Sequence, residues 1–326
     1  MPHRVPGAAP VGSCMWNIAH RGGAGLWPEN SLAAFRDAVA RGCDGAELDV
    51  QLSRDGEVIV FHDYRLKPEI CRGADGAWLK PPTPRIKDLS LAELQAFDIG
   101  RADPSSGYAR LHPDLHGLDG ERIPTLAQVI EIAQSAARPF HLFVELKTSF
   151  ADRAVSADPI ALAVATLRVL RDANYLDRTI LVGFDWPGLL HAKTLEPALD
   201  CWFTTLPQSW FRDAPVPDED DPPSEPALQM LRQWARSGTS PWAAGYDAVN
   251  YGGSVIRAIK AAGGDGWFPY WRDLHPSAIA EARSLGLRIG AWTVDEPADL
   301  QHMIDLGIDA ICTDRPDLLA KLANSA

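Results

Sequence analysis

The sequence predicts one α/β domain, a (β/α)8 or TIM barrel that covers residues 1–326 and carries long insertions on its C-terminal face. Short apolar runs alternate with helix-like segments along the chain, which is typical of a parallel sheet. Eight strand positions are found when one hairpin is counted once, and this number at this length favours a closed barrel. Two long segments each follow a strand, where a barrel carries its functional loops. A doubly wound open sheet is the alternative fold.

Each expected strand is short, apolar and rich in β-branched or aromatic residues. The strands are expected at residues 16–19, 45–62 (the hairpin), 140–146, 179–184, 201–205, 266–270, 288–294 and 309–313. The expected helices lie between them, at residues 31–42, 125–136, 158–173, 275–286 and 296–307. Ser31 or Asn30 is expected to cap the first helix, because short polar side chains accept hydrogen bonds from free helical N–H groups.

The hairpin reads ELDVQLSRDGEVIVFHD. Its Asp55-Gly56 pair predicts a two-residue type I′ turn between two strands. With this turn, position 49 lies opposite position 62, so Glu47, Asp49 and His62 share one face. Two carboxylates on one face repel each other unless a positive charge lies between them, and Mg²⁺ and Ca²⁺ prefer such oxygens. The hairpin therefore favours a cation site slightly over the alternative, an ordinary solvated strand face.

Residues 64–122 and 206–264 are longer than ordinary connections. The first insertion contains Ser90 and Glu93 at the spacing of a capping box. In the second, PVPDEDDPPSEP is too polar and proline-rich to pack as an element, so we expect it to be exposed to solvent. An acidic rim there would favour cationic headgroups. The aromatic residues of the second insertion are expected to fold over the mouth as a lid that shapes the headgroup pocket; these are Trp210, Phe211, Trp234 and Trp242.

Composition excludes several classes of function. The net charge of −12 argues against a nucleic-acid surface, although an acidic protein can still bind an anion in one basic pocket. Five scattered cysteines without CxxC spacing indicate reduced thiols rather than a disulfide framework or a zinc site. No segment resembles a signal peptide or a membrane span, so we expect a cytoplasmic protein without a stable membrane anchor. The sequence carries no signal for an oligomeric state.

Several polar residues follow expected strands. His20 and Arg21 end the first strand and are followed by glycines and by Glu29-Asn30 at a helix start. Glu145 and Lys147 are spaced to face the same way near the end of a later strand. Each feature alone has an ordinary interpretation, either a surface pair or a buried ion pair inside a barrel. Together with the hairpin residues they all fall at C-terminal strand ends, where barrel active sites lie.

Five segments, taken in this order, resemble the glycerophosphodiester phosphodiesterases of the phosphatidylinositol-phospholipase-C-like superfamily. The segments are HRGGAGLWPEN, GAELDVQLSRDGEVIVFHD, IPTLAQVIEIA, FVELK and AWTVDEPADLQHMIDLGIDAICTDRPDLL. The resemblance implies a TIM-barrel hydrolase that depends on one divalent cation, Mg²⁺ or Ca²⁺, and cleaves small-molecule phosphodiesters of glycerol. Ser31 departs from the more usual Thr, and Gly183 stands where a Ser often precedes Phe.

The resemblance also implies roles for individual residues. Glu47, Asp49 and Glu145 match metal ligands, His20 and His62 match an acid–base pair, and Arg21 and Lys147 match phosphate contacts. By analogy His20 is the base and His62 the acid. The chemistry agrees, since an alkoxide leaving group needs a general acid and a hydroxyl nucleophile needs a general base. Glu29 and Asn30 are expected to orient these groups. Phe184 and Trp292 are expected to wall the alcohol side, although core packing explains both aromatics equally well.

Three functions compete on these residues. The leading one releases glycerol 3-phosphate and an alcohol from a glycerophosphodiester. A lysophospholipase-D-type enzyme would keep the chemistry and need an apolar groove, which Trp210, Phe211, Trp267 and Trp271 could build. A non-catalytic phosphate-binding barrel is disfavoured because both histidines and all three carboxylates are present. A zinc amidohydrolase is disfavoured because it usually needs an HxH pair after the first strand, and this chain has none.

Overall fold

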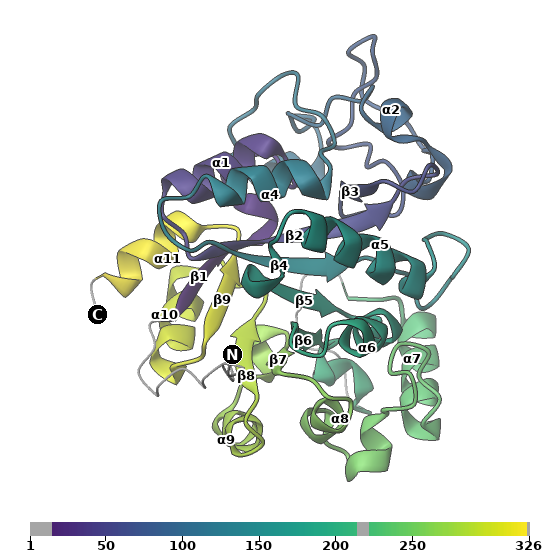
Figure 1. The fold of residues 1–326 in the computed structure, drawn as a ribbon, viewed down its shortest axis with the longest axis vertical. Helices are drawn as coiled ribbons and strands as arrows, with labels where there is room; N and C mark the ends of the chain where they lie inside the picture. Colours follow the sequence, from purple (N-terminus) through teal and green to yellow (C-terminus); the bar gives the residue numbers. More distant parts are fainter. Residues whose placement is uncertain (1–14, 214–221, 325–326) are drawn as a thin grey trace, which may run out of the picture.

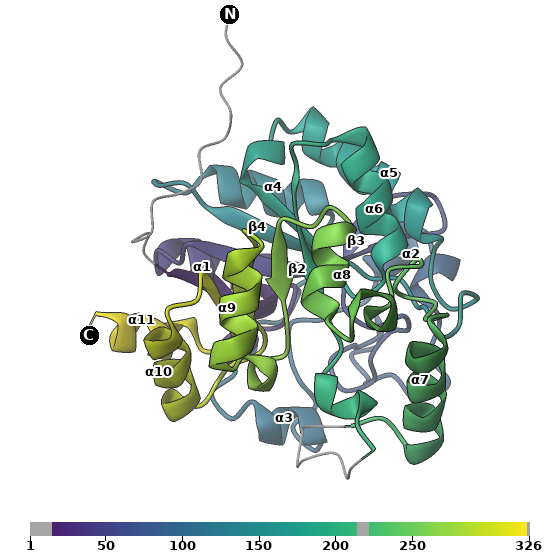
Figure 2. The same ribbon diagram turned by 90° about the horizontal axis from the view of Figure 1, so that it is seen from below.

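The computed structural model describes residues 15–213 and 222–324, and its centre is a closed barrel of eight parallel strands (Figures 1 and 2). β1 pairs with β2 on one side and with β9 on the other, which closes the ring. The TIM-barrel prediction is therefore confirmed, and the open sheet is excluded. The barrel strands are β1 (Trp16–Ala19), β2 (Gly45–Leu52), β4 (His141–Leu146), β5 (Thr179–Gly183), β6 (Asp200–Thr204), β7 (Gly266–Phe268), β8 (Arg288–Ala291) and β9 (Ala310–Thr313).

Helices surround the barrel and follow most of its strands (Figure 1). The five predicted helices form as α1 (Leu32–Ala40), α4 (Leu126–Gln134), α5 (Pro159–Asp172), α9 (Pro276–Ser284) and α10 (Pro297–Leu306). Outside the first insertion, four other helices of the described chain were not predicted: α6 (Trp186–Leu195), α7 (Glu225–Ser237), α8 (Val255–Ala261) and α11 (Pro316–Ala323). Ser31, rather than Asn30, is the N-cap of α1, since its side chain accepts the Ala34 N–H at 3.1 Å.

Large aromatic side chains fill the barrel interior. Phe143 and Trp202 pack edge to face with ring centroids 5.2 Å apart. Phe143 lies two residues before Glu145 on β4, and Trp202 lies two residues before Thr204 on β6. Side chains two residues apart on a strand share a face, so in both strands the aromatic ring and the polar side chain point into the barrel, with the polar one nearer the C-terminal end. A Cβ on Gly266 would lie 2.5 Å from the Trp202 ring, so glycine is needed at that position. The aromatic layer makes a packed floor, and polar residues occupy the C-terminal end above it.

The predicted register of the hairpin is wrong by one residue. β3 (Val58–Val60) runs antiparallel to β2 with Val50 opposite Val60, and the Phe61 N–H donates to the Asp49 carbonyl at 2.9 Å. Asp49 therefore lies opposite Phe61 and not His62. Gly56 has a φ of +83° but Asp55 does not have a positive φ, so the turn is not type I′.

A three-residue loop makes this turn. The Gly56 N–H donates to the Ser53 carbonyl at 3.0 Å, and the Ser53 N–H donates to the Glu57 carbonyl at 3.0 Å. The Asp55 carboxylate explains the choice, because it accepts hydrogen bonds from the Ser53 hydroxyl and from the Leu91 N–H of the first insertion. Tertiary contact thus selects a three-residue loop with glycine in the left-handed position over the two-residue alternative that the same dipeptide allows.

The first insertion, residues 64–122, packs around a small apolar cluster of its own. Leu66, Ile86, Leu94 and Tyr108 are buried there together with Phe61 from the end of the hairpin. The insertion contains two short helices, α2 (Leu91–Leu94) and α3 (Gly107–Leu111). The predicted capping box at the start of α2 is confirmed, since both of its hydrogen bonds are present. Because the cluster also contains Ile59 of β3, it anchors the insertion on the hairpin. Figure 1 shows the insertion beside β3.

The second insertion is shorter than predicted, because α8 is the ordinary barrel helix between β6 and β7. The polar segment predicted to lack structure contains the start of α7 at Glu225, while residues 214–221 lie outside the described residues. Trp242 packs against Phe211 and Trp234, with ring centroids 5.9 and 6.2 Å apart. It also packs at 5.2 Å against Phe150, which follows β4. The aromatic residues therefore lie at the C-terminal side of the barrel.

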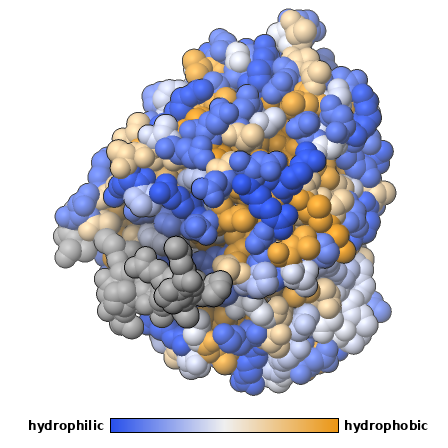
Figure 3. Space-filling model, in the orientation of Figure 1, coloured by the Kyte–Doolittle hydropathy of each residue, from blue (hydrophilic) through white to orange (hydrophobic). Residues whose placement is uncertain are grey.

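Four of the five cysteines, Cys43, Cys71, Cys201 and Cys312, lie in the described part of the chain, and all four are buried free thiols. This agrees with the prediction of reduced cysteines, and Cys14 lies outside the described residues. Among the described residues, no helix has the length and apolar character needed to cross a membrane. Hydrophilic residues cover much of the face in Figure 3, with hydrophobic residues between them near its middle.

Candidate active site

Three carboxylates meet at the C-terminal end of β2 and β4. Glu47 and Asp49 point inward from β2, and Glu145 is the register partner of Asp49 on β4. One oxygen of each lies within 4.8 Å of one oxygen of the others. Glu47 and Asp49 are almost fully buried. The structure therefore brings together the three residues predicted to bind metal, and they form a cluster that could hold a metal ion.

Glu47 is the electrostatically strained member of this cluster. Burial and the neighbouring charge of Asp49 raise the pKa of Glu47 to about 8. Its Oε2 accepts the Arg21 N–H at 3.1 Å, but its buried Oε1 has no hydrogen-bond partner among the described residues. These residues fit a bound divalent cation, because a cation would compensate the charge and coordinate the orphaned oxygen.

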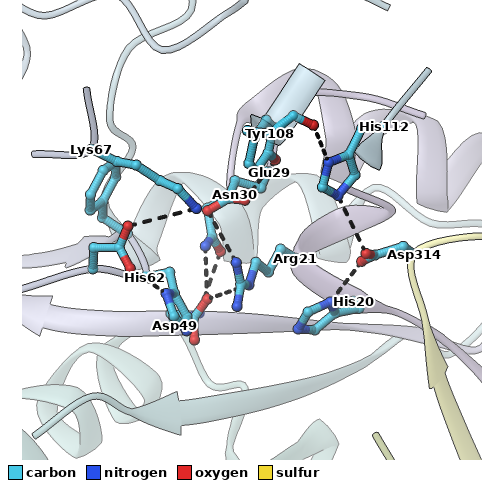
Figure 4. Close-up of polar contacts among 12 residues, drawn as sticks. His20, Arg21, Glu29, Asn30, Asp49, His62, Lys67, Tyr108, His112 and Asp314 are labelled. Carbon is cyan, nitrogen blue, oxygen red and sulfur yellow. Dashed lines mark hydrogen bonds and ion pairs between the residues drawn. The ribbon is translucent and has the colours of Figure 1, made fainter. Parts of the chain in front are cut away.

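Lys147 and Arg21 bring positive charge to the same place. Lys147 Nζ lies 2.9 Å from Glu145 Oε1 and 3.5 Å from Asp49 Oδ1. Arg21 Nε lies 3.3 Å from Asp49 Oδ2, and Figure 4 marks this ion pair. Burial opposes the charge on both side chains, but these carboxylates and Glu29 raise the pKa values of Lys147 and Arg21 above their ordinary values. Both side chains are therefore fixed cations beside the cluster.

The HRG segment has an unusual backbone that aims Arg21 at the cluster. Arg21 has a left-handed φ of 49°, and Gly22 follows with a φ of +84°. A Cβ on Gly22 would lie 2.7 Å from the Ala34 side chain, so only glycine fits between the first strand and α1. This turn directs the Arg21 N–H toward Glu47 and the guanidinium toward Asp49. Backbone strain of this kind is typical of functional sites.

Glu29 and Asn30 lie behind the cluster rather than in the pocket. Asn30 donates to Asp49 Oδ2 at 2.8 Å, and Glu29 accepts from Arg21 at 3.2 Å. Tyr108 of the first insertion donates its hydroxyl to Glu29 at 2.7 Å (Figure 4). Glu29 and Asn30 thus contact Arg21 and Asp49, and their role in orienting these groups stays a prediction. Tyr108 adds a link from the insertion that the sequence did not reveal.

His20 is held by a carboxylate from the other end of the chain. Its Nδ1 lies 2.7 Å from Asp314 Oδ1, immediately after β9. Burial is the largest single effect and opposes protonation of this imidazole, but the charge and hydrogen bond of Asp314 and the charge of Glu47 together outweigh it and raise the pKa of His20 to about 9. Burial alone would raise the pKa of Asp314, but the charge of His20 and the hydrogen bonds from His20 and His112 lower it. His112 of the first insertion approaches the second oxygen of Asp314 at 3.7 Å (Figure 4).

His62 reaches the site although it does not lie in the ladder opposite Asp49. It follows Phe61 after the end of β3, and its Nδ1 lies 2.8 Å from Asp63 Oδ1. The buried Gln51 amide holds this segment by donating to the carbonyls of Phe61 and Asp63, both at 2.8 Å. Burial, together with the charge of Arg21, lowers the pKa of His62 below its ordinary value. The Gln51 contacts, and not the turn, set the position of His62.

These residues line one pocket of about 190 Å³ at the mouth of the barrel. Its lining contains His20, Arg21, Glu47, His62, Glu145, Lys147, Phe184, Thr204, Phe268, Trp292, Thr293 and Cys312. Phe184 and Trp292 pack edge to face with ring centroids 5.3 Å apart and form an aromatic wall. Asp49, Glu29 and Asn30 are the predicted site residues that do not line the pocket. None of the predicted lid aromatics is among its lining residues.

Sequence reasoning missed five residues that hold this site: Gln51, Asp63, Tyr108, His112 and Asp314. Asp63 and Asp314 each follow a strand closely, in FHD and ICTD, and that placement was a usable signal. Tyr108 and His112 lie in an insertion without strong periodicity, so nothing in the sequence tied them to the barrel. Gln51 reads as an ordinary polar strand residue.

The barrel thus carries, in one pocket, a carboxylate cluster, two fixed cations and two histidines that are each bound to a carboxylate. Such a set of groups is typical of an enzyme that acts on an anionic substrate by acid–base catalysis. The sequence of residues 20–318 matches the glycerophosphoryl diester phosphodiesterase family. The chain therefore belongs to this family of phosphodiesterases.

Individual relatives agree with this assignment. A glycerophosphodiester phosphodiesterase of Caldanaerobacter subterraneus subsp. tengcongensis is 26% identical over 305 residues, which cover 94% of this chain and 96% of the relative. The crystal structure of a putative glycerophosphoryl diester phosphodiesterase from Silicibacter pomeroyi DSS-3 matches with a TM-score of 0.78 and 29% identity, covering 96% of this chain and 94% of that chain.

A third similar protein has been solved with a product bound. It is an Oleispira antarctica phosphodiesterase in complex with sn-glycerol-3-phosphate, with a TM-score of 0.65 and 22% identity. The match covers 95% of this chain and 96% of that chain. At this level of identity the likeness supports the fold alone.

Proposed function

We propose that this protein hydrolyses glycerophosphodiesters to glycerol 3-phosphate and an alcohol, using one divalent cation, Mg²⁺ or Ca²⁺, held by Glu47, Asp49 and Glu145. The observation that carries the proposal is the meeting of this cluster with two carboxylate-bound histidines in one pocket. The glycerol 3-phosphate product of the Oleispira antarctica phosphodiesterase supports the choice of substrate class.

The basic side chains would bind the phosphodiester. Arg21 and Lys147 both line the pocket and keep their charge, so they can contact the non-bridging oxygens that carry the negative charge of the substrate. A divalent cation in the carboxylate cluster would add Lewis acidity at the phosphoryl group. Glu29 and Asn30 hold Arg21 and Asp49 in place from behind, which preorganises the site before substrate arrives.

The two histidines would move the protons. Each holds its Nδ1 against a carboxylate, which leaves Nε2 for proton transfer with the substrate or water. The raised pKa of His20 favours its protonated form and the lowered pKa of His62 favours its neutral form, which is opposite to the order expected by analogy. A cation bound beside Glu47 would favour loss of the His20 proton by charge repulsion. On that basis we keep His20 as the base, whereas His62 is kept as the acid on the family resemblance alone, with Asp314 and Asp63 as positioning residues.

Phe184 and Trp292 would flank the glycerol or alcohol side of the substrate, since their edge-to-face pair forms one wall of the pocket. The lysophospholipase-D alternative needs an accessible apolar groove. Trp267, one of the residues expected to build it, is only 1% exposed and donates its ring N–H to Thr205 in the buried core. The geometry therefore favours a small polar diester over a lipid. A cytoplasmic location and the lid function of residues 206–264 remain predictions.

The test is a metal-dependent product assay. Chelator-treated protein should release no glycerol 3-phosphate from glycerophosphoglycerol, and addition of Mg²⁺ or Ca²⁺ should restore release. His20→Ala and His62→Ala should each fold normally and lose activity by about 10²–10⁴-fold, because each removes a proton-transfer partner. His302→Ala is the matched control, since His302 is exposed on α10. The proposal would be contradicted if neither Mg²⁺ nor Ca²⁺ restored product release, or if a histidine variant kept near-normal turnover.

A further inference from the structure

A second cavity of about 150 Å³ lies beside the catalytic pocket, between the end of β6 and the second insertion. Thr204, the last residue of β6, lines both spaces, so they are neighbours across one residue. The cavity is also lined by Trp186 at the start of α6 and by the segment that contains Trp242 and Asp247. A volume of this order is enough for a group the size of a small ring.

The charge of this cavity comes from one residue. Asp247 is 4% exposed, and its Oδ1 accepts the Ser240 N–H at 3.0 Å. Its Oδ2 is buried and has no hydrogen-bond partner in the part of the chain that the structure describes. None of the described lining residues is Lys, Arg or His. A buried carboxylate oxygen without a partner carries a desolvation cost, and a positively charged ligand would offset that cost.

The walls of the cavity are aromatic. The lining includes Trp186, Phe211, Trp242 and Tyr246. The Trp242 ring is fixed by packing against Phe211 at 5.9 Å, and its backbone carbonyl accepts the Trp186 N–H at 2.9 Å. Aromatic faces attract cations, and they do so best when the cation is poorly hydrated. The walls therefore complement the charge of Asp247.

These features together select one chemical class. A small metal ion would need several oxygen ligands, and the cavity offers one carboxylate. An anion is repelled by Asp247. A neutral apolar molecule would leave the Asp247 oxygen unpaired. An alkylammonium group satisfies both surfaces, since its charge pairs with the carboxylate and its methyl or methylene groups contact the rings.

We propose that this cavity is an organic-cation site, which takes the alkylammonium group of a small molecule against Asp247 and the surrounding aromatic rings. Two sources of such a group fit: the cationic alcohol of a glycerophosphodiester that also occupies the catalytic pocket, and a free amine. The first source rests on the proposed function and on the shared Thr204, whereas the site itself rests on neither the metal nor turnover.

Binding is tested first in the absence of turnover. Choline is titrated into chelator-treated full-length protein while tryptophan fluorescence is recorded, with 3,3-dimethylbutanol as the neutral compound of the same shape. Choline should bind at least about tenfold more tightly than the alcohol, because only the cation pairs with Asp247. Asp247→Asn should remove this preference, and Asp305→Asn, an exposed acid on α10, should keep it. Equal binding of the two compounds, or absence of choline binding, overturns the proposal even if Asp247→Asn fails to fold.

The kinetic comparison then separates the two sources. The ratio of kcat/KM for glycerophosphocholine over glycerophosphoglycerol is measured in the wild type and in Asp247→Asn. A fall in this ratio by about tenfold or more assigns the site to the substrate headgroup. An unchanged ratio with choline-selective binding in the first experiment assigns it to a free amine. If neither diester is cleaved, the proposed function fails while the binding experiment still decides the cation site.

Discussion

Asp314→Asn should release His20 from the charge that holds its proton. The pKa of His20 in the folded protein is about 9, against an ordinary value of 6.5, and the charge of Asp314 is the largest of the contributions that raise it. At about 1.4 kcal/mol per pKa unit, this difference corresponds to about 3 kcal/mol between the two protonation states. Without the carboxylate, burial and the charge of Arg21 both act downward, so the pKa of His20 should fall below 6.5.

The same change predicts how stability depends on pH. Because the folded pKa of His20 lies above its unfolded value, the stabilisation is fully present below pH 6.5 and is lost as the pH rises through about 9. The free energy of unfolding of the chelated wild type should therefore decrease across this window by up to about 3 kcal/mol more than that of Asp314→Asn.

Two measurements check this prediction. Nuclear magnetic resonance of the imidazole carbons gives the pKa of His20 in both proteins, and urea unfolding at pH 6.5 and 9.5 gives the stabilities. Asp63→Asn is the matched control, since it removes the carboxylate of the other histidine pair and should leave His20 titrating near 9. If His20 in Asp314→Asn still titrated near 9, the electrostatic account of this pair would be refuted.

Three further changes probe other parts of the site. Glu47→Gln should raise the free energy of unfolding of the chelated protein at pH 9 by about 1–3 kcal/mol. The reason is that the folded pKa of Glu47, about 8, lies above its unfolded value, so this carboxyl destabilises the folded state increasingly as the pH rises between the two values. The same substitution should abolish the thermal shift caused by Mg²⁺ or Ca²⁺. Gln51→Met should lower kcat strongly with a smaller change in KM, since it frees the segment that carries His62 at a cost of about 1–3 kcal/mol; an unchanged kcat would remove Gln51 from the positioning of His62. Deletion of residues 213–226 should leave hydrolysis of glycerophosphoglycerol intact, whereas Trp210→Ala should change the ranking of headgroups; the lid prediction is wrong if that ranking stays the same.

The barrel was predictable because its signals are local. Each strand is a short apolar run, and the predicted bounds of β1 match the observed residues 16–19. The helices that were missed, such as α6 and α8, are short or carry apolar residues around much of their surface, so the 3.6-residue period is weak in them. The pairing of Glu47 with Asp49 was predictable for the same reason, since both lie on one strand, whereas Glu145 joined the predicted ligands through the family resemblance and the register of β2 with β4 places it beside Asp49.

What sequence reasoning missed depends on contacts between distant segments. The hairpin was assigned the wrong loop because Asp55 is bound by the Leu91 N–H of an insertion whose path was not predictable. His62 still reached the pocket, but because of Gln51 and not because of strand pairing. The partner of His20 lies 294 residues away, so no local pattern connects the two residues.

That separation has a consequence for the timing of synthesis. A growing chain that has not yet made β9 already contains all three carboxylates and both histidines of the site. It still has no strand to seal β1 on its open edge and no acid to hold the first imidazole. Competence to cut a phosphodiester should therefore arrive in a single late step, when the last strand of the ring is added, and loss of that strand by proteolysis should abolish it in the same abrupt way.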